Sequence, residues 1–275
     1  MPRFFLCIAA SCLLVPGCSR TPRDLASRVI QFDEAANAHN TAGVVALMTD
    51  DAVLTGPDGR VFRGKDQIGG WFRGLVHGFH VESMPARQAV DTVTWRSTVW
   101  SDAFAHSGVY PVGVTTTAIF SSDRIVRFSS VFDRETMQKM KFLEFFEDVV
   151  DGGDIGAIDR FLSDDFKEHE EAVPGSPSGR EGVKTWFRML KEAFPDIHVT
   201  PKVLVADRDV VVAYAVWEGT NTGKFMGKAP TGKKVSYDGI DMIRIVGDKA
   251  VEHWGLSDVT ALMKQLSGGK SQSPR

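Results

Sequence analysis

An internal repeat places the strongest limit on the folds that this sequence can adopt. Residues 64–75 (GKDQIGGWFRGL) and residues 179–190 (GREGVKTWFRML) align without a gap, and both contain the triplet Trp-Phe-Arg. Residues 47–51 likewise match residues 161–165, upstream of these segments. Self-similarity over several blocks in one order is typical of duplicated structural units. The sequence therefore predicts two copies of one domain.

The spacing of apolar residues is also repeated. In each copy four apolar residues follow steps of 4, 3 and 4, which is typical of the buried stripe of an amphipathic helix. Further on, Asp133 of the first copy aligns with Asp258 of the second, where the last helix should begin, so both are expected to cap a helix. The two stripes are Ile68, Phe72, Leu75 and Phe79, and Val183, Phe187, Leu190 and Phe194.

Each copy is expected to run helix, helix, short strand, helix and then several strands. An antiparallel sheet curved around helices leaves one open mouth, so the predicted fold class is α+β, with two tandem cone-shaped domains, each a sheet wrapped around about three helices. The domains are assigned to residues 24–137 and 138–266. In the second copy the expected helices are 140–150, 155–162 and 179–193, and the expected strands are 197–206, 210–220, 234–245 and 250–257.

The first 18 residues have the features of a lipoprotein signal peptide. Arg3 precedes an apolar run that is too short to span a bilayer, and the run ends in Val-Pro-Gly before Cys18. We expect residues 1–17 to be removed, Cys18 to be acylated, residues 18–23 to form a linker, and residues 267–275 to be a disordered tail. The mature protein would then be exported and lipid-anchored, facing the periplasm or the cell surface. Ser19 favours the outer membrane in a Gram-negative cell.

Charge and motif content exclude several classes of function. The net charge of −3 gives no basic patch for nucleic acid. The seven histidines are scattered, without the spacing of a zinc helix, and neither a Gly-rich phosphate loop nor a nucleophile elbow is present. We therefore expect no metal, no cofactor and no nucleic-acid partner.

Two stretches of the second copy resemble a known family. They are residues 193–199 (AFPDIHV) and the run of Trp217-Glu218-Gly219-Thr220-Asn221-Thr222-Gly223, Pro-Thr-Gly at 230–232, and Glu252-His253-Trp254. The copy is similar to the SnoaL-like polyketide and ester cyclases, a branch of the nuclear-transport-factor-2-like superfold. The first copy lacks both turn motifs, so the second is expected to be the closer match.

This resemblance implies a cavity for a small apolar molecule and an aspartate that acts as acid and base. Asp241 is the candidate, because it lies in an apolar strand where burial would raise the pKa of a carboxylate. If the strand alternates regularly, Tyr237 and Asp241 share one face, and Asp238 and Arg244 share the other. His169 follows the second helix, where the family often has a cavity histidine, and is the second catalytic candidate.

The remaining candidates are expected to bind the ligand. Trp217 shares its strand face with small residues that would leave a cavity open, whereas His253 and Trp254 should point to opposite faces of their strand. Asn221 stands where the family commonly has a histidine, and an asparagine can form hydrogen bonds but cannot relay a proton near neutral pH. The ligand-binding set is Trp217, Asn221, Tyr237, Arg244, His253 and Trp254.

Two functions remain open at this point. An open cavity that holds Asp241 near His169 would indicate a cofactor-free cyclisation or isomerisation. A cavity closed by Trp217 and Trp254 would instead indicate a non-catalytic binding or protein-interaction lipoprotein of the cell envelope. In either case the sheet faces could pair, within the chain or between two copies.

Overall fold

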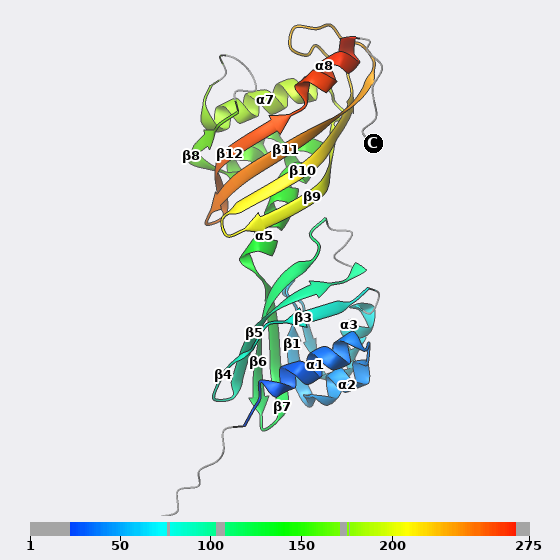
Figure 1. Ribbon diagram of the computed structural model, residues 1–275, viewed down its shortest axis with the longest axis vertical. Coiled ribbons are helices and arrows are strands. Elements are labelled where there is room, and N and C mark those ends of the chain that lie inside the picture. The colour runs from blue at the N-terminus through cyan, green and yellow to red at the C-terminus, as the bar shows by residue number, and fades with distance from the viewer. Residues whose placement is uncertain (1–22, 76–77, 103–107, 171–174, 176, 268–275) are drawn as a thin grey trace, which may run out of the picture.

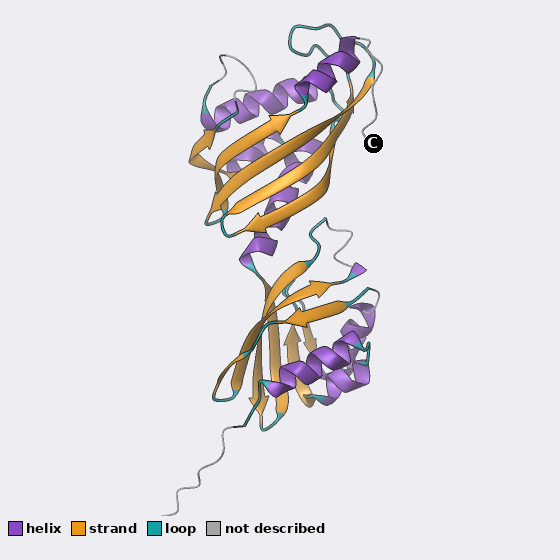
Figure 2. Cartoon of the chain, in the orientation of Figure 1, coloured by secondary structure: helices purple, strands orange, loops and turns teal. Residues whose placement is uncertain are grey.

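The computed structural model describes two α+β domains that lie end to end (Figure 1), with helices against one face of each sheet (Figure 2). It covers residues 23–75, 78–102, 108–170, 175 and 177–267. The expected signal peptide, Cys18 and residues 268–275 of the expected tail lie outside these described residues, whereas Ser267 still belongs to a helix. Of the helices within the described ranges, none has the length and apolar character that crossing a bilayer requires.

The first domain has the expected order of elements, except that a second short strand, β2, precedes the third helix. Its sheet runs β2-β1-β7-β6-β5-β3, with β4 also beside β5, and β1 pairs with β7 in parallel. The bounds are α1 (Ser27–Asn37), α2 (Thr41–Ala46), β1 (Met48–Thr55), β2 (Val61–Arg63), α3 (Gly64–Leu75), β3 (His80–Ser83), β4 (Arg87–Ala89), β5 (Thr92–Trp100), β6 (Val112–Ser121) and β7 (Arg124–Phe132).

The second domain repeats this topology. Its sheet runs β8-β12-β11-β10-β9, and β8 pairs with β12 in parallel, as β1 pairs with β7. The bounds are α5 (Arg134–Phe145), the π-helical turn η1 (Phe146–Asp151), the 3₁₀ turn η2 (Ile155–Ala157), α6 (Ile158–Phe161), β8 (Leu162–Glu168), α7 (Gly179–Ala193), β9 (His198–Asp207), β10 (Val210–Thr220), β11 (Lys234–Val246), β12 (Lys249–Ser257) and α8 (Val259–Ser267).

The amphipathic stripes hold the helices to their sheets as expected. On α7 the side chains of Val183, Phe187 and Leu190 are buried, and on α3 those of Ile68 and Phe72 are buried. Full burial of one such side chain contributes about 1.5–3 kcal/mol. The 3.6-residue period therefore decides which face of each helix meets the sheet.

Both aspartates expected at helix starts are N-caps. Asp258 Oδ1 accepts a hydrogen bond from Ala261 N at 2.8 Å, and Asp133 Oδ1 accepts one from Thr136 N at 2.9 Å. Asp133 caps α5, which closes the first domain and also opens the second, and Leu143 of this helix packs against both cores. The boundary expected between residues 137 and 138 thus falls inside a helix that the two domains share.

The register of the two sheets shows which residues are equivalent. In the first domain Phe128 of β7 pairs with Leu54 of β1, and in the second His253 of β12 pairs with Glu168 of β8. Two residues further along, Ser130 pairs with Thr116, which in turn pairs with Trp95. The matching positions of the second domain are Gly255, Asp241 and Ala213.

At these equivalent positions the first domain carries apolar side chains, Leu54, Trp95 and Phe128, that fill its interior. Trp95 is 4% exposed, and its ring meets Phe128 edge-on at 5.8 Å. A hollow of about 10 Å³ beside Val44 and Phe72 is too small for a ligand. The first domain therefore has a packed apolar core where the second has small and ionisable residues.

Candidate active site

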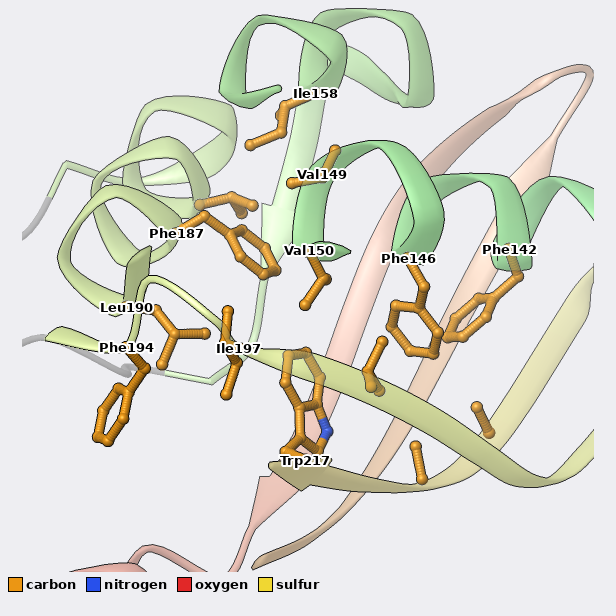
Figure 3. Packing of buried hydrophobic residues seen from close by; sticks show 14 of the residues in the cluster. Phe142, Phe146, Val149, Val150, Ile158, Phe187, Leu190, Phe194, Ile197 and Trp217 are labelled. Carbon is orange, nitrogen blue, oxygen red and sulfur yellow. The ribbon is translucent and has the colours of Figure 1, made fainter. Parts of the chain in front are cut away.

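The second domain encloses a cavity of about 390 Å³ between its helices and its sheet. This volume lies in the range of roughly 300–1,000 Å³ that is usual for small-molecule sites. Figure 3 shows Phe146 and Val150 of η1 above the Trp217 ring on β10, with Phe187 of α7 alongside. The aromatic walls include Phe142, Phe145, Phe146, Phe187, Trp217 and Tyr237.

Regular alternation of β11 places one set of its side chains in the cavity and the other on the outer face. Tyr237 and Asp241 both line it, as the sequence predicted, and Gly239 lies between them. A Cβ atom at Gly239 would lie 2.9 Å from Trp217 Nε1, so this glycine leaves room in front of the indole N–H. Trp217 Nε1 and Asp241 Oδ2 are both buried without a hydrogen-bond partner among the described residues. A ligand could therefore bring an acceptor and a donor to them.

His253 joins two carboxylates at this end of the cavity. Its Nδ1 donates to the two Glu168 oxygens at 2.8 and 2.9 Å, and its Nε2 donates to Asp241 Oδ1 at 3.2 Å. Burial by itself lowers the pKa of His253, but the hydrogen bonds to Asp241 and Glu168 outweigh it and raise the pKa to about 10. His253 is therefore an imidazolium at neutral pH, with both nitrogens donating.

A third carboxylate lies beside this set. A Cβ atom at Gly255, which pairs directly with Asp241, would overlap the Glu170 carboxylate. Burial raises the pKa of Glu170, with His253 opposing the rise and Glu168 and Asp241 adding to it. Burial, and then the charges of Asp241 and Glu170, hold the pKa of the Tyr237 phenol well above its usual value. The end of the cavity is thus crowded with negative charge.

His169 does not pair with Asp241, which corrects the arrangement expected from the sequence. His169 borders the cavity, but its ring lies toward the outer face, where Nε2 is 3.1 Å from Glu252 Oε2 and the ring stacks on Trp254 at 4.5 Å. The histidine that pairs with Asp241 is His253. The cause is that His169 follows Glu168 directly at the end of β8, so the two side chains take opposite faces.

Two predicted ligand-binding residues lie on the outer face of the sheet. Arg244 donates a hydrogen bond to Glu252 Oε1, and Trp254 stacks against the His169 ring. Neither Arg244 nor Trp254 lines the cavity. His253 and Trp254 do point to opposite faces, as predicted. Tyr237, Trp217 and His253 are therefore the members of the predicted ligand-binding set that the structure brings together at the cavity.

Asn221 also lies away from the cavity. Its side chain is buried in the loop after β10, where Oδ1 accepts from Thr231 N at 2.9 Å and Nδ2 donates to Gly223 O at 2.9 Å. The side chain joins the Thr-Gly and Pro-Thr-Gly turns to each other. Its identity therefore bears on the loop and not on proton transfer within the cavity.

We expect Asn221→Ala to lower the free energy of unfolding by roughly 2 kcal/mol, because it leaves buried loop groups without partners. Affinity for a cavity ligand should change less than two-fold. Guanidinium denaturation and calorimetric titration measure the two quantities. Loss of ligand binding at full stability would contradict this assignment.

Glu168 and Glu170 are the site residues that the sequence did not predict. In the described part of the chain, no group of three or more His, Cys, Asp or Glu side chains is arranged to hold a metal ion. The chemistry that this arrangement offers is hydrogen bonding and proton transfer by carboxylates beside an imidazolium.

Comparison with solved structures gives matches to about half of the chain. TsrD from Streptomyces laurentii is 25% identical, with 49% of this chain and 96% of that chain covered and a TM-score of 0.44. IdmH from Streptomyces antibioticus is 28% identical, with 46% and 96% covered and a TM-score of 0.41. A SnoaL-like polyketide cyclase from Agrobacterium tumefaciens is 19% identical, with 46% and 95% covered and a TM-score of 0.40. No curated protein matches this sequence.

Comparison of the sequence with protein families gives one match in each of the two domains. The family of SnoaL-like polyketide cyclases matches residues 141–266, and the family of SnoaL-like domains matches residues 29–128. Each match falls on one of the two sheets with its helices. The chain therefore belongs to the SnoaL-like proteins and carries two of their domains in tandem.

Proposed function

We propose that the second domain binds a small apolar or amphipathic molecule and moves a proton on it without a cofactor, as a cyclase or isomerase does. The observation that supports this most is the buried Asp241 Oδ2, which has no partner in the described chain and lines the aromatic cavity. A carboxylate oxygen placed in this way can accept a proton from a bound molecule.

The proposed chemistry needs an acidic C–H group beside a carbonyl. Asp241 Oδ2 takes the proton from carbon, and Trp217 Nε1 donates a hydrogen bond to the carbonyl oxygen, where negative charge develops. Asp241 then returns the proton to another atom of the enolate, or the enolate carbon attacks a second carbonyl of the same molecule and closes a ring, and Asp241 gives the proton to the new alkoxide oxygen. Proton and electron pair are conserved in both outcomes.

His253 and Glu168 position the base. The imidazolium holds Asp241 Oδ1 by a hydrogen bond, which leaves Oδ2 as the free oxygen, and Glu168 fixes the ring from its other nitrogen. A histidine held by a carboxylate is a common way to fix ring orientation in active sites. The parallel pairing of β8 with β12 brings these two residues together.

The proposal also includes export and a lipid anchor at Cys18. The charged start, the short apolar run and the final cysteine of residues 1–18 support it. An intact mass of the protein extracted from membranes, compared with that of Cys18→Ser, tests whether acyl chains are attached.

Deuterium exchange on carbon tests the proton transfer before the natural substrate is known. We expect the full chain to accelerate exchange at the α-carbon of some members of a panel of aromatic ketones and 1,3-diketones in D₂O, followed by proton NMR. Compounds that exchange should also raise the melting temperature. A panel that neither exchanges nor shifts melting would overturn the proposal, whereas melting shifts without exchange would indicate binding alone.

One observation favours a second function, a protein-interaction role. The outer face of the second sheet carries two apolar rows that cross β9, β10, β11 and β12, and we call them the apolar band. Leu256 is 71% exposed and Val205 is 54% exposed, and such surfaces often mark association sites. The rows are Val203, Tyr214, Ile240 and Leu256, and Val205, Val212, Met242 and Trp254.

The partner that fits the apolar band is a second copy of the chain. On β11, Arg244 and Asp238 stand on the outer face at equal distances either side of Asp241. A two-fold axis across the strands at that level would set Arg244 of one copy opposite Asp238 of the other, with apolar rows between them. The molar mass in solution tests this pairing, and a monomer at high concentration would exclude it.

A further inference from the structure

The ionisable end of the cavity holds more negative than positive charge. Glu168 and Asp241 both accept hydrogen bonds from His253, and one imidazolium can neutralise only one of these two carboxylates. The charges that act on Glu170 are those of His253, Glu168 and Asp241. A negative charge without a counter-charge is costly in a partly buried site, because water solvates it less well there.

The excess charge lies on the cavity side of the sheet. Asp241 and Gly255 are direct cross-strand partners, and the Glu170 carboxylate occupies the space that a side chain at Gly255 would fill. Side chains of such pairs lie only about 5 Å apart. The carboxylates of Glu170 and Asp241 therefore face the same part of the cavity, and the proton transfer proposed above does not use Glu170.

The aromatic walls next to these carboxylates also suit a cation. Tyr237 and Trp217 stack at 6.3 Å with 13° between their planes, and Phe146 meets Trp217 edge-on at 5.7 Å. The faces of such rings attract ammonium and guanidinium groups, most strongly where water is excluded. Charge and ring placement thus favour the same kind of ligand.

We propose that the molecule bound in this cavity is an organic cation that carries an ammonium or amidinium group on an apolar body. Its nitrogen lies next to the carboxylates of Glu170 and Asp241. This inference rests on the proposed function, since it names the ligand class of the same cavity. The N–H groups of the cation donate to the Glu170 carboxylate, which leaves Asp241 Oδ2 free to take the proton from carbon, and its apolar body lies along Phe146 and Trp217.

Three probes with one carbon skeleton test this charge preference: 4-phenylbutylamine, 4-phenylbutan-1-ol and 4-phenylbutanoate. Calorimetric titration of the full chain at pH 7 gives the dissociation constants. We expect the amine to bind at least ten-fold more tightly than the alcohol, and the carboxylate at least ten-fold more weakly. The ratio of amine to alcohol affinity should fall at least five-fold in Glu170→Gln and stay unchanged in Glu218→Gln, which alters the outer face of β10.

The outcomes separate this inference from the function on which it rests. Equal binding of amine and alcohol, or a ratio that Glu170→Gln leaves unchanged, would overturn the cationic ligand and leave a neutral ligand in the same cavity. Failure of all three probes to bind, together with no exchange on any ketone, would remove both proposals.

Discussion

Asp241→Asn lowers the rate of α-carbon exchange by about 10³-fold, within the range of 10²–10⁴ that general bases contribute. The amide keeps the shape of the side chain, but it cannot accept a proton from carbon. Affinity should change less than the rate, because the aromatic walls remain. Exchange rates and dissociation constants for the most reactive ketone of the panel measure the two effects.

Asp238→Asn is the matched control for this change. Asp238 lies on the same strand three residues away, and its side chain is on the outer face, where it hydrogen-bonds Tyr214. We expect its exchange rate to stay within two-fold of the unmodified protein. An equal loss in both variants would assign the effect to β11 as a whole, and full activity in Asp241→Asn would remove this residue from catalysis.

His253→Phe costs about 3–5 kcal/mol of unfolding free energy at pH 7, because it leaves the partly buried Glu168 and Asp241 without their cation. The first domain provides the control, since Phe128, Leu54 and Thr116 stand at the three equivalent positions. The triple variant His253→Phe, Glu168→Leu, Asp241→Thr removes all three charges together. Its stability should return to within about 1 kcal/mol of the unmodified protein or exceed it.

Guanidinium denaturation of the single and triple variants measures this difference. Both variants should lack exchange activity, so stability and catalysis separate in the triple variant. Equal stability of the single variant and the unmodified protein would show that the imidazolium does not balance the two carboxylates.

The free energy of unfolding of the unmodified protein and of the triple variant should depend differently on pH. The pKa of His253 is raised from 6.5 to about 10 on folding, so its stabilising effect is complete below pH 6.5 and is lost as pH rises through 10. The unmodified protein should therefore lose roughly 3–5 kcal/mol between these pH values. The triple variant should not show that part of the loss.

The repeated pattern was sufficient to predict the fold, since periodicity and turn residues are local signals. The stripe on α7, the alternation of β11 and the caps at Asp133 and Asp258 all depend on residues close in sequence. Gly247 has φ +64 in the turn between β11 and β12, a conformation that glycine adopts without steric cost.

The histidine partner of Asp241 could not be predicted in this way. Glu168 and His253 lie 85 residues apart and meet because β8 pairs with β12 in parallel. Nothing local in Lys-Glu-His-Glu-Glu shows which residues face inward. Comparison of the two copies held a usable signal. The alignment of residues 47–51 with 161–165 makes Glu168 equivalent to Leu54, and the alignment of Asp133 with Asp258 makes His253 equivalent to Phe128. Leu54 and Phe128 are a buried apolar pair. An ionisable pair in place of an apolar one is typical of a functional site.

Asn221 shows the opposite case, a residue selected from a family motif that has a local structural role. Its amide groups are used within the loop, by Thr231 and Gly223. A motif position identifies a residue, but only its contacts show whether it reaches the cavity.

Through helix α5, the shape of the cavity depends on the position of the first domain. Near its start, Thr136 Oγ1 accepts from Gly113 N at 2.8 Å, and further along, Phe142 and Phe145 form part of the cavity wall. Because α5 is one continuous helix, a tilt of the first domain would also move these two rings. A cut at residue 138 would remove the cap at Asp133 and free the start of this helix, so the second domain cannot be excised there without altering the shape of its own cavity.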